Sequence, residues 1–375
     1  MEKSMFSRSL RLALIILVLS GIVAMPQRSA KAALQVLVNG DFEQGDGVGW
    51  QPWPPGTPNL VWNTAVHNNQ PAPAHSGSWI AYLGGANDYS AQLSQTVTFA
   101  DNTYMSFWYW IDTQESFCGR DSAAIWVNSH PVQIFTLCAS WNTGGWVQAI
   151  YDISPYVSSG QTGDILFDIS TDRSAPSRWL IDDVTFHKTF ADVPNTDSFA
   201  PFIEAIYQAG ITTGCSTSPF LMYCPASSVT RAQMAVFLER GIHGSSYVPP
   251  AVGGSTGFSD VATSYWAAAW IKQLAADSIT GGCGSGIYCP ESPVTRAQMA
   301  IFLLRAKHGT SYSPPAVGAS TGFSDVSTTY WAAAWIKQLA AEGITGGCGS
   351  GIYCPESPVT RGQMAVFLVR TFSLP

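Results

Sequence analysis

The sequence predicts a multidomain protein whose N-terminal half is an all-β sandwich and whose C-terminal half is mainly α-helical. Two observations predict this division. Residues 34–188 contain short runs of β-branched and aromatic residues separated by Gly, Asn, Asp and Pro, which is typical of strands and turns. From residue 189 onward, a pattern of two helices and a cysteine-bracketed loop occurs three times, which is typical of a repeat protein.

Residues 1–32 have the pattern of a secretory signal peptide, so we expect them to be removed on export. Basic residues precede the apolar run 12–24, and a small-x-small cleavage site follows at 30–32. The whole chain has a net charge of −7. Without residues 1–32 it keeps 13 basic and 24 acidic residues, a net charge of −11. This balance argues against nucleic acid or an anionic membrane as a partner, and no second apolar run predicts a membrane span.

Six runs within residues 34–188 have the composition of strands, and no convincing helix accompanies them. In the run 103–111 both faces would carry bulky side chains, so we expect a central strand in a stack of two sheets. The six runs are 78–83, 91–99, 103–111, 123–128, 164–170 and 179–186.

Three repeated units follow, and each opens with Phe-x-Asp-Val, the first at Phe190. In the second unit Trp266, Trp270 and Leu274 recur every four residues, which predicts a helix over 264–276 with these residues on its apolar face. A second helix closes each unit. Because each unit is too small to bury a core alone, we expect the three to pack together.

The eight cysteines form four pairs of sequence neighbours, which after an export signal predicts four disulfides. The alternative is a metal site at which the three C-terminal pairs converge. The Cys-x5-Cys spacing lacks the tight Cys-x2-Cys knuckle, however, and no histidine accompanies it. The predicted disulfides are Cys118–Cys138, Cys215–Cys224, Cys283–Cys289 and Cys348–Cys354.

A Thr-Arg-x-Gln step precedes the second helix of every unit. Its threonine and glutamine have the spacing of a capping box, in which each side chain bonds the other residue's backbone N–H. This explains both residues as helix architecture, worth on the order of 1 kcal/mol each. The three predicted boxes pair Thr230 with Gln233, Thr295 with Gln298, and Thr360 with Gln363.

The arginine of this step needs a separate explanation. Arg231, Arg296 and Arg361 lie at the first helical position, where the helix dipole disfavours a cation by about 0.3–1 kcal/mol. One explanation is a bound anion, held by the guanidinium and by free backbone N–H groups. The other is an internal carboxylate, such as Asp260 or Glu291 for Arg296.

The motifs "FSDV", "YWAAAWIKQLAAEGITGG" and "YCPESPVTRGQMAVFL" resemble S-layer homology (SLH) domains, in the usual three copies. The resemblance implies a pseudo-threefold, mainly α assembly of repeats at 189–242, 257–307 and 322–373. It also implies that grooves between the repeats bind a pyruvylated, anionic wall polysaccharide, and that the arginine contacts the pyruvyl group. The candidate ligand-binding residues are Arg231, Arg296, Arg361, Trp266 and Trp331.

The sequence departs from this family in two respects. Glutamine replaces the usual glutamate of the Thr-Arg motif but still serves the capping box, and bracketing cysteines replace residues of an ordinary loop. The first unit also lacks the tryptophan pair and has a longer cysteine loop. Its groove is therefore the least secure of the three expected.

In the N-terminal half, the stretches 37–53 and 178–187 resemble the first and last strands of jelly-roll carbohydrate-binding modules. The resemblance implies a jelly-roll sandwich and a structural calcium ion, for which Glu43, Asp182 and Asp183 are the matching carboxylates. The three could equally be turn and strand-end residues. Four tryptophans near predicted loops could stack on sugar rings, although any one of them could be a core residue: Trp50, Trp53, Trp62 and Trp141.

Motifs for catalysis are weak. Two Gly-x-Ser-x-Gly matches, at 253–257 and 318–322, lie in duplicated Pro-rich linkers rather than in the strand–turn–helix setting that the motif needs. We therefore expect an exported, non-enzymatic cell-surface protein without a required cofactor, held on wall polysaccharide by its SLH repeats and displaying a sandwich that could bind a second glycan. The alternatives are a wall-anchored polysaccharide hydrolase, using two carboxylates in 34–188, and a subunit of a surface lattice.

Overall fold

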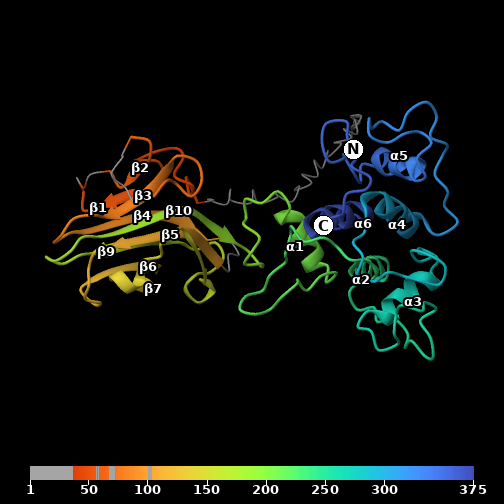
Figure 1. Cartoon of the computed structure of the whole chain (residues 1–375), viewed down its shortest axis with the longest axis horizontal. Helices are drawn as coiled ribbons and strands as arrows, with labels where there is room; N and C mark the ends of the chain where they lie inside the picture. The colour runs from red at the N-terminus through yellow and green to blue at the C-terminus, as the bar shows by residue number, and fades with distance from the viewer. Residues whose placement is uncertain (1–36, 56, 58, 67–71, 100–103) are drawn as a thin grey trace, which may run out of the picture. The chain divides into compact units, whose positions relative to one another are not determined.

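The structure is a computed structural model that describes residues 37–375, except residues 56 and 58 and the segments 67–71 and 100–103. The predicted signal peptide lies outside the described residues. The described part contains a β-rich region that ends at His187 and a helical region that follows it (Figure 1). No helix in the described part is both long and apolar enough to cross a membrane.

The β-rich region is the predicted sandwich of two antiparallel sheets (Figure 1). The strand order is β1-β4-β9-β6-β7 in one sheet and β2-β3-β10-β5-β8 in the other. The strands are β1 (Gln51–Trp53), β2 (Val61–Asn63), β3 (Trp79–Gly84), β4 (Ser90–Thr98), β5 (Tyr104–Thr113), β6 (Asp121–Val127), β7 (His130–Leu137), β8 (Val147–Asp152), β9 (Thr162–Ser170) and β10 (Ser177–His187).

Side chains alternate along each strand, so the inner faces of the two sheets enclose one apolar core. In β5, Met105, Phe107 and Ile111 are buried in this core, while Trp108 and Trp110 point to the opposite face. Strand β5 lies between β10 and β8, which confirms its predicted interior position. The sequence misses β1, β2, β7 and β8, because the first two are three residues long and the other two are largely exposed edge strands.

Each repeated unit contributes a short helix and a longer one (Figure 1). The helix predicted over 264–276 begins only at Ala268, because residues 262–268 form hydrogen-bonded turns before it. Trp266 therefore precedes the helix and does not belong to its apolar face. The helices are α1 (Ala200–Gln208), α2 (Arg231–His243), α3 (Ala268–Ala276), α4 (Arg296–His308), α5 (Ala333–Ala341) and α6 (Arg361–Phe372).

The three units close into a ring through one valine each. The N–H of Val229 donates to the carbonyl of Val359 at 2.8 Å, that of Val294 to Val229 at 3.0 Å, and that of Val359 to Val294 at 2.9 Å. Each valine directly precedes a capping-box threonine. Because every unit donates one of these bonds and accepts one, the assembly is pseudo-threefold and has no terminal unit.

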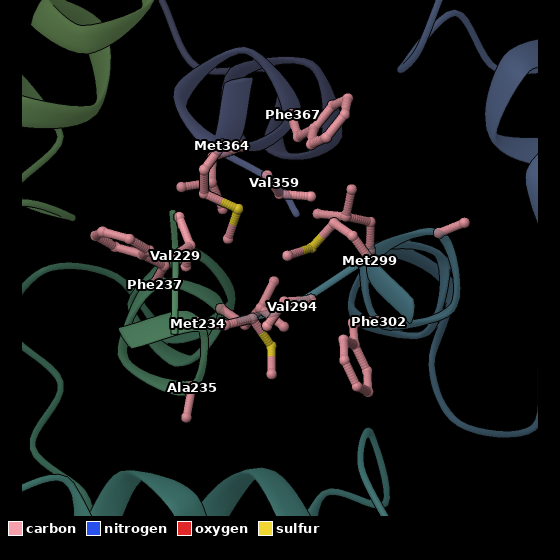
Figure 2. Close-up of a cluster of buried hydrophobic side chains, with 14 of the residues drawn as sticks. Val229, Met234, Ala235, Phe237, Val294, Met299, Phe302, Val359, Met364 and Phe367 are labelled. Atoms are coloured by element: carbon pink, nitrogen blue, oxygen red, sulfur yellow. The ribbon is translucent and has the colours of Figure 1, made fainter. Parts of the chain in front are cut away.

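The longer helices α2, α4 and α6 pack around this ring (Figure 2). Met234, Met299 and Met364 converge beside the three valines, and all six side chains are fully buried. One apolar cluster contains residues of all three units. The prediction that the units share a core is therefore confirmed.

All four predicted disulfides are present, so the alternative of a cysteine metal site is wrong. In each unit the aspartate of Phe-x-Asp-Val secures the cysteine loop. Asp260 accepts hydrogen bonds from the N–H groups of Tyr288 at 2.8 Å and Cys289 at 2.7 Å, and Asp192 and Asp325 do the same in the other units. This gives the opening motif a structural role that the sequence did not reveal.

Candidate functional site

Two grooves lie between the repeats, and each is lined by residues of all three units. The first groove, of about 270 Å³, combines Gln233, Phe237 and Arg240 of the first unit with Trp266 of the second and Arg361 of the third. The second groove, of about 280 Å³, combines Gln298, Phe302 and Arg305 of the second unit with Trp331 of the third and Arg231 of the first. Each groove contains two arginines, and no described carboxylate lines either one.

The capping box places the first arginine of each groove. The Thr230 side chain accepts a hydrogen bond from the N–H of Gln233, and the Gln233 side chain accepts one from the N–H of Thr230. The same reciprocal box joins Thr295 with Gln298 and Thr360 with Gln363, so all three predicted boxes are confirmed. Because the box fixes where each helix begins, the arginine becomes the first helical residue in all three units.

The arginines are almost completely buried, which the sequence did not indicate. Arg231 is 2% exposed, Arg296 3% and Arg361 4%. The Nε–H of Arg231 donates to the carbonyl of Tyr288 at 2.7 Å, and the Tyr288 hydroxyl donates back to the Arg231 carbonyl at 2.8 Å. The guanidinium carbon lies 4.8 Å from the ring centre of Tyr288 and 5.6 Å from that of Phe302. Two aromatic rings and the hydrogen bond from Nε thus hold this cation in one position, and the tyrosine hydroxyl holds the backbone of the same arginine.

None of these guanidinium groups is neutralised by a close acidic partner within the described residues. Burial lowers the pKa of Arg296, and the charge of Asp325 only partly opposes this. The internal partners predicted for Arg296 are wrong. Asp260 instead binds the cysteine loop of its own unit, and Glu291 accepts a hydrogen bond from the hydroxyl of Tyr265.

The expected free N–H groups at the helix starts are also absent from the described structure. The N–H of Arg296 donates to the carbonyl of Ser357 at 3.0 Å, and that of Ala297 to Pro355 at 2.9 Å. The third N–H donates to the capping threonine. The neighbouring unit therefore satisfies the helix end, so the backbone N–H groups of the helix start do not serve an anion in a groove. In the first groove, Nη2 of Arg361 is buried without a partner among the described residues.

Sequence reasoning missed a second arginine in each groove. Arg240 donates from Nη1 to the carbonyl of Ile211 at 3.2 Å, and its guanidinium carbon lies 5.4 Å from the ring centre of Trp270. Arg305 repeats both contacts in the second groove. The Nε atoms of Arg240 and Arg305 have no partner in the described part of the chain. The available signal was the recurrence of an arginine nine residues after each Thr-Arg pair.

The two candidate tryptophans lie at the grooves. Trp266 is 60% exposed and lines the first groove, and Trp331 is 58% exposed and lines the second. An exposed indole beside a cationic hollow is a surface on which a sugar ring can stack. Their role is therefore different from that of Trp270 and Trp335, which pack partly buried against the core.

The pseudo-threefold assembly has a third position equivalent to the two grooves, beside α6, and Arg296 and Gln363 belong to it. Neither residue lines one of the two grooves. Gln363 caps α6, whereas the capping glutamines of the other two units also line a groove. The residue of the first unit that matches Trp266 is Ser198, so the third position has no tryptophan. The missing tryptophan of the first unit therefore affects this position and leaves the first groove complete. This corrects the expectation that the first unit's own groove is the least secure.

The sandwich carries a separate aromatic surface on the outer face of the sheet β2-β3-β10-β5-β8. Trp62 stacks on Tyr82 with ring centres 4.0 Å apart, and Trp110 contacts Trp146 edge to face at 6.1 Å. Arg178 donates to the Tyr82 hydroxyl at 2.9 Å, which adds a polar group to this face.

Of the four tryptophans predicted from the sequence to stack on sugars, only Trp62 is on this aromatic surface. Trp50 is 1% exposed and belongs to the core, which is the alternative that the sequence left open for each of the four. Trp53 and Trp141 are exposed elsewhere on the sandwich. The other aromatic residues of the surface lie within strands or beside them, where their periodicity does not distinguish them from core.

The three carboxylates predicted to bind calcium all hold the segment 75–79. Glu43 accepts hydrogen bonds from two of its N–H groups at 2.7 and 2.8 Å, and Asp182 accepts from two others at 2.9 and 3.2 Å. Asp183 accepts one from a serine hydroxyl of the same segment at 2.7 Å. Burial, with the charge of Asp183, raises the pKa of Asp182 to about 7. Calcium at these residues stays a prediction.

The fold and the grooves together define a class of protein: a β-sandwich joined to three interlocking helical repeats that form cationic hollows. The sequence profile of the S-layer homology domain matches residues 189–235, 257–300 and 322–365. The chain therefore contains three S-layer homology domains, as its motifs predicted.

About half of the chain is similar to curated proteins, two of which are named for anchoring or for the cell surface. A cellulosome-anchoring protein of Acetivibrio thermocellus is 24% identical over 190 residues, which cover 50% of this chain and 39% of that protein. A cell surface protein of Thermoanaerobacter kivui is 26% identical over 186 residues, 50% of this chain and 21% of that protein. An amylopullulanase of Thermoanaerobacterium thermosulfurigenes is 28% identical over 187 residues, but only 9% of the enzyme is covered. The chain thus spans less than half the length of these relatives.

The sandwich is similar to solved carbohydrate-binding modules. A family 61 module in complex with β-1,4-galactotriose is 18% identical, with a TM-score of 0.31, covering 40% of this chain and 95% of that one. A family 28 module specific for non-crystalline cellulose is 15% identical, with a TM-score of 0.29, covering 41% and 93%. The assignment of a β-sandwich does not depend on them, because the strand order given above establishes it.

Proposed function

We propose that this protein is exported to the cell surface and held there, without a covalent bond, by an anionic wall polysaccharide that occupies the two grooves. The observation that carries the proposal is the charge of the grooves. The chain as a whole is acidic, yet each groove presents two arginines and no described carboxylate. The three S-layer homology domains, and relatives named as anchoring and cell-surface proteins, support it.

Each groove suits a sugar that carries a carboxylate. The ring of the sugar would stack on Trp266 in the first groove or Trp331 in the second. Its carboxylate would accept hydrogen bonds from the guanidinium groups, Arg361 and Arg240 in the first groove. We take this acidic group to be the carboxylate of a pyruvate ketal. Two such sites on one polymer would raise the avidity well above the affinity of either.

We propose that the sandwich is a non-enzymatic glycan-binding domain. Its aromatic surface, with the partly exposed rings of Trp62, Trp110 and Trp146 and the polar side chain of Arg178, has the stacking rings and polar groups that a sugar-binding face needs. A hydrolase would need two carboxylates free to act on the substrate. The carboxylates of Glu115 and Asp121 accept hydrogen bonds from serine hydroxyls within the fold, which supports a structural role for them.

The test is co-sedimentation of the full-length protein with purified cell walls, before and after removal of pyruvate ketals. We expect the protein to sediment with intact walls and to stay in solution after the ketals are removed. Sedimentation that does not depend on the ketals would contradict the pyruvylated ligand, and no sedimentation at all would contradict wall anchoring. Incubation with a panel of polysaccharides tests the enzymatic alternative, since release of reducing sugar would refute a purely binding role.

A further inference from the structure

Three side chains with metal-ligating atoms meet at the junction of the first and second units, away from the grooves. Glu239 and His243 lie one turn apart on α2, and Asp277 directly follows α3. Nε2 of His243 is 3.4 Å from Oε2 of Glu239 and 3.4 Å from Oδ2 of Asp277. Ligating atoms of all three lie within 4.8 Å of one another. The cluster thus joins two units that are separate in the sequence.

Glu239 is the member of this cluster that the fold does not explain. Its side chain is 0% exposed, and neither carboxylate oxygen has a hydrogen-bond partner among the described residues. A buried carboxylate without compensation is strongly destabilising. A positive charge placed between Glu239 and Asp277 would supply that compensation.

The distances fit a metal ion better than direct hydrogen bonds. A charge-assisted N–H···O bond is about 2.7–2.9 Å long, so 3.4 Å is a poor one. Two ligands of a tetrahedral zinc ion, each about 2.0–2.1 Å from the metal, are about 3.4 Å apart. His243 and Asp277 are each about one-third exposed, which leaves a route for the ion to enter.

The second unit provides an internal comparison. Leu304 occupies the position that matches Glu239, and Nζ of Lys307 forms an ion pair with Oε2 of Glu342 at 2.9 Å. His308 lies 2.8 Å from the same carboxylate. In the second unit, therefore, the single acid, Glu342, is neutralised by Lys307 of the protein itself. The first unit has an additional acid and no lysine at the matching position, so it lacks the internal compensation that the second unit has.

We propose that Glu239, His243 and Asp277 bind one zinc ion, with water in the fourth position, and that this ion fastens the first unit to the second. One imidazole and two carboxylates suit zinc, whereas calcium takes six to eight oxygen ligands. The site is separate from the grooves and does not depend on the proposed function.

The test uses the full-length protein, freed of metal with a chelator and then titrated with zinc chloride in a calorimeter. We expect one zinc ion per chain and a melting temperature that rises with zinc concentration. His243→Ala and Glu239→Leu should each abolish both effects. The leucine variant carries the residue that the second unit tolerates at the same position, so it should keep its fold by circular dichroism.

His308→Ala is the matched control, because it alters the equivalent histidine of the second unit and should leave zinc binding unchanged. The proposal is wrong if the wild-type protein binds no zinc at micromolar concentrations. It is also wrong if His243→Ala binds zinc as well as the wild type, or if His308→Ala loses binding to the same extent, since the ion would then lie elsewhere.

Discussion

The ring of Phe199 in the first unit lies against the backbone of Gly362 in the third, so closely that a Cβ on Gly362 would come within 2.7 Å of Cδ2 of the ring. Gly362 is the single difference between the stretches 281–300 and 346–365, where the second unit has Ala297. At the other two junctions, alanine occupies the positions that match both Phe199 and Gly362. The large ring and the missing side chain are therefore complementary features of the junction that closes the ring of units.

Gly362→Ala should destabilise the protein, even though alanine is the better helix former by about 1 kcal/mol. The new methyl group would collide with the partly buried ring of Phe199, and such overpacking typically costs about 1–3 kcal/mol. Phe199→Ala added to Gly362→Ala should recover part of the loss, because the pair then matches the other junctions. Denaturant unfolding of the wild type, both single variants and the double variant measures this coupling. Additive effects of the two substitutions would rule it out.

Wall binding should depend more on the arginines that line the two grooves than on Arg296. Arg240→Gln with Arg305→Gln should abolish co-sedimentation with walls, because each groove then loses one of its two cations. These side chains are less buried than Arg231 and Arg361, so the fold should survive the change. Arg296→Gln should weaken binding least, since Arg296 lines neither groove. Unchanged binding by the double variant, with a normal circular dichroism spectrum, would return these arginines to a structural role.

Trp266→Ala with Trp331→Ala should also reduce wall binding, but with little effect on stability. Both indoles are more than half exposed, and surface substitutions usually change the unfolding free energy by less than about 0.5 kcal/mol. Trp141→Ala is the control, because Trp141 is similarly exposed on the sandwich and should not affect wall binding. If the double variant binds walls as well as the control does, the tryptophans do not take part in the site.

The sequence predicts best those features that depend on neighbouring residues. The capping boxes and disulfides join residues close in the sequence, so spacing alone identified them. The surroundings of the arginines could not be predicted, because the atoms that hold Arg361 come from Tyr223, 138 residues earlier. The same applies to the grooves, since no single unit contains one. Local patterns therefore gave the starts of the three longer helices, while the burial of the cations and the composition of each groove required the closed ring of units.

The stability of the sandwich should fall between neutral pH and about pH 4 because of His187. This residue is 2% exposed, and its Nε2 lies 2.7 Å from Oγ of Ser106. Burial lowers the pKa of His187 to about 4, because its effect is larger than the opposing effect of the negative charge of Asp192. The unfolded chain binds a proton at this residue below about pH 6.5, whereas the folded protein stays neutral there until about pH 4. Stability contributed by the neutral ring is thus fully present above pH 6.5 and is lost progressively down to pH 4, by about 3 kcal/mol.

His187→Gln should remove most of this acid sensitivity, because glutamine can keep a hydrogen bond to Ser106 and does not titrate. The measurement is the unfolding free energy at intervals from pH 7 to pH 4, for the wild type and the variant. His130→Gln is the matched control, since His130 is exposed and its replacement should leave the pH dependence as it is. A His187→Gln variant that loses stability on acidification as steeply as the wild type would show that the sensitivity arises instead from carboxylates whose pKa the fold lowers, such as Glu115, which accepts a hydrogen bond from Ser174.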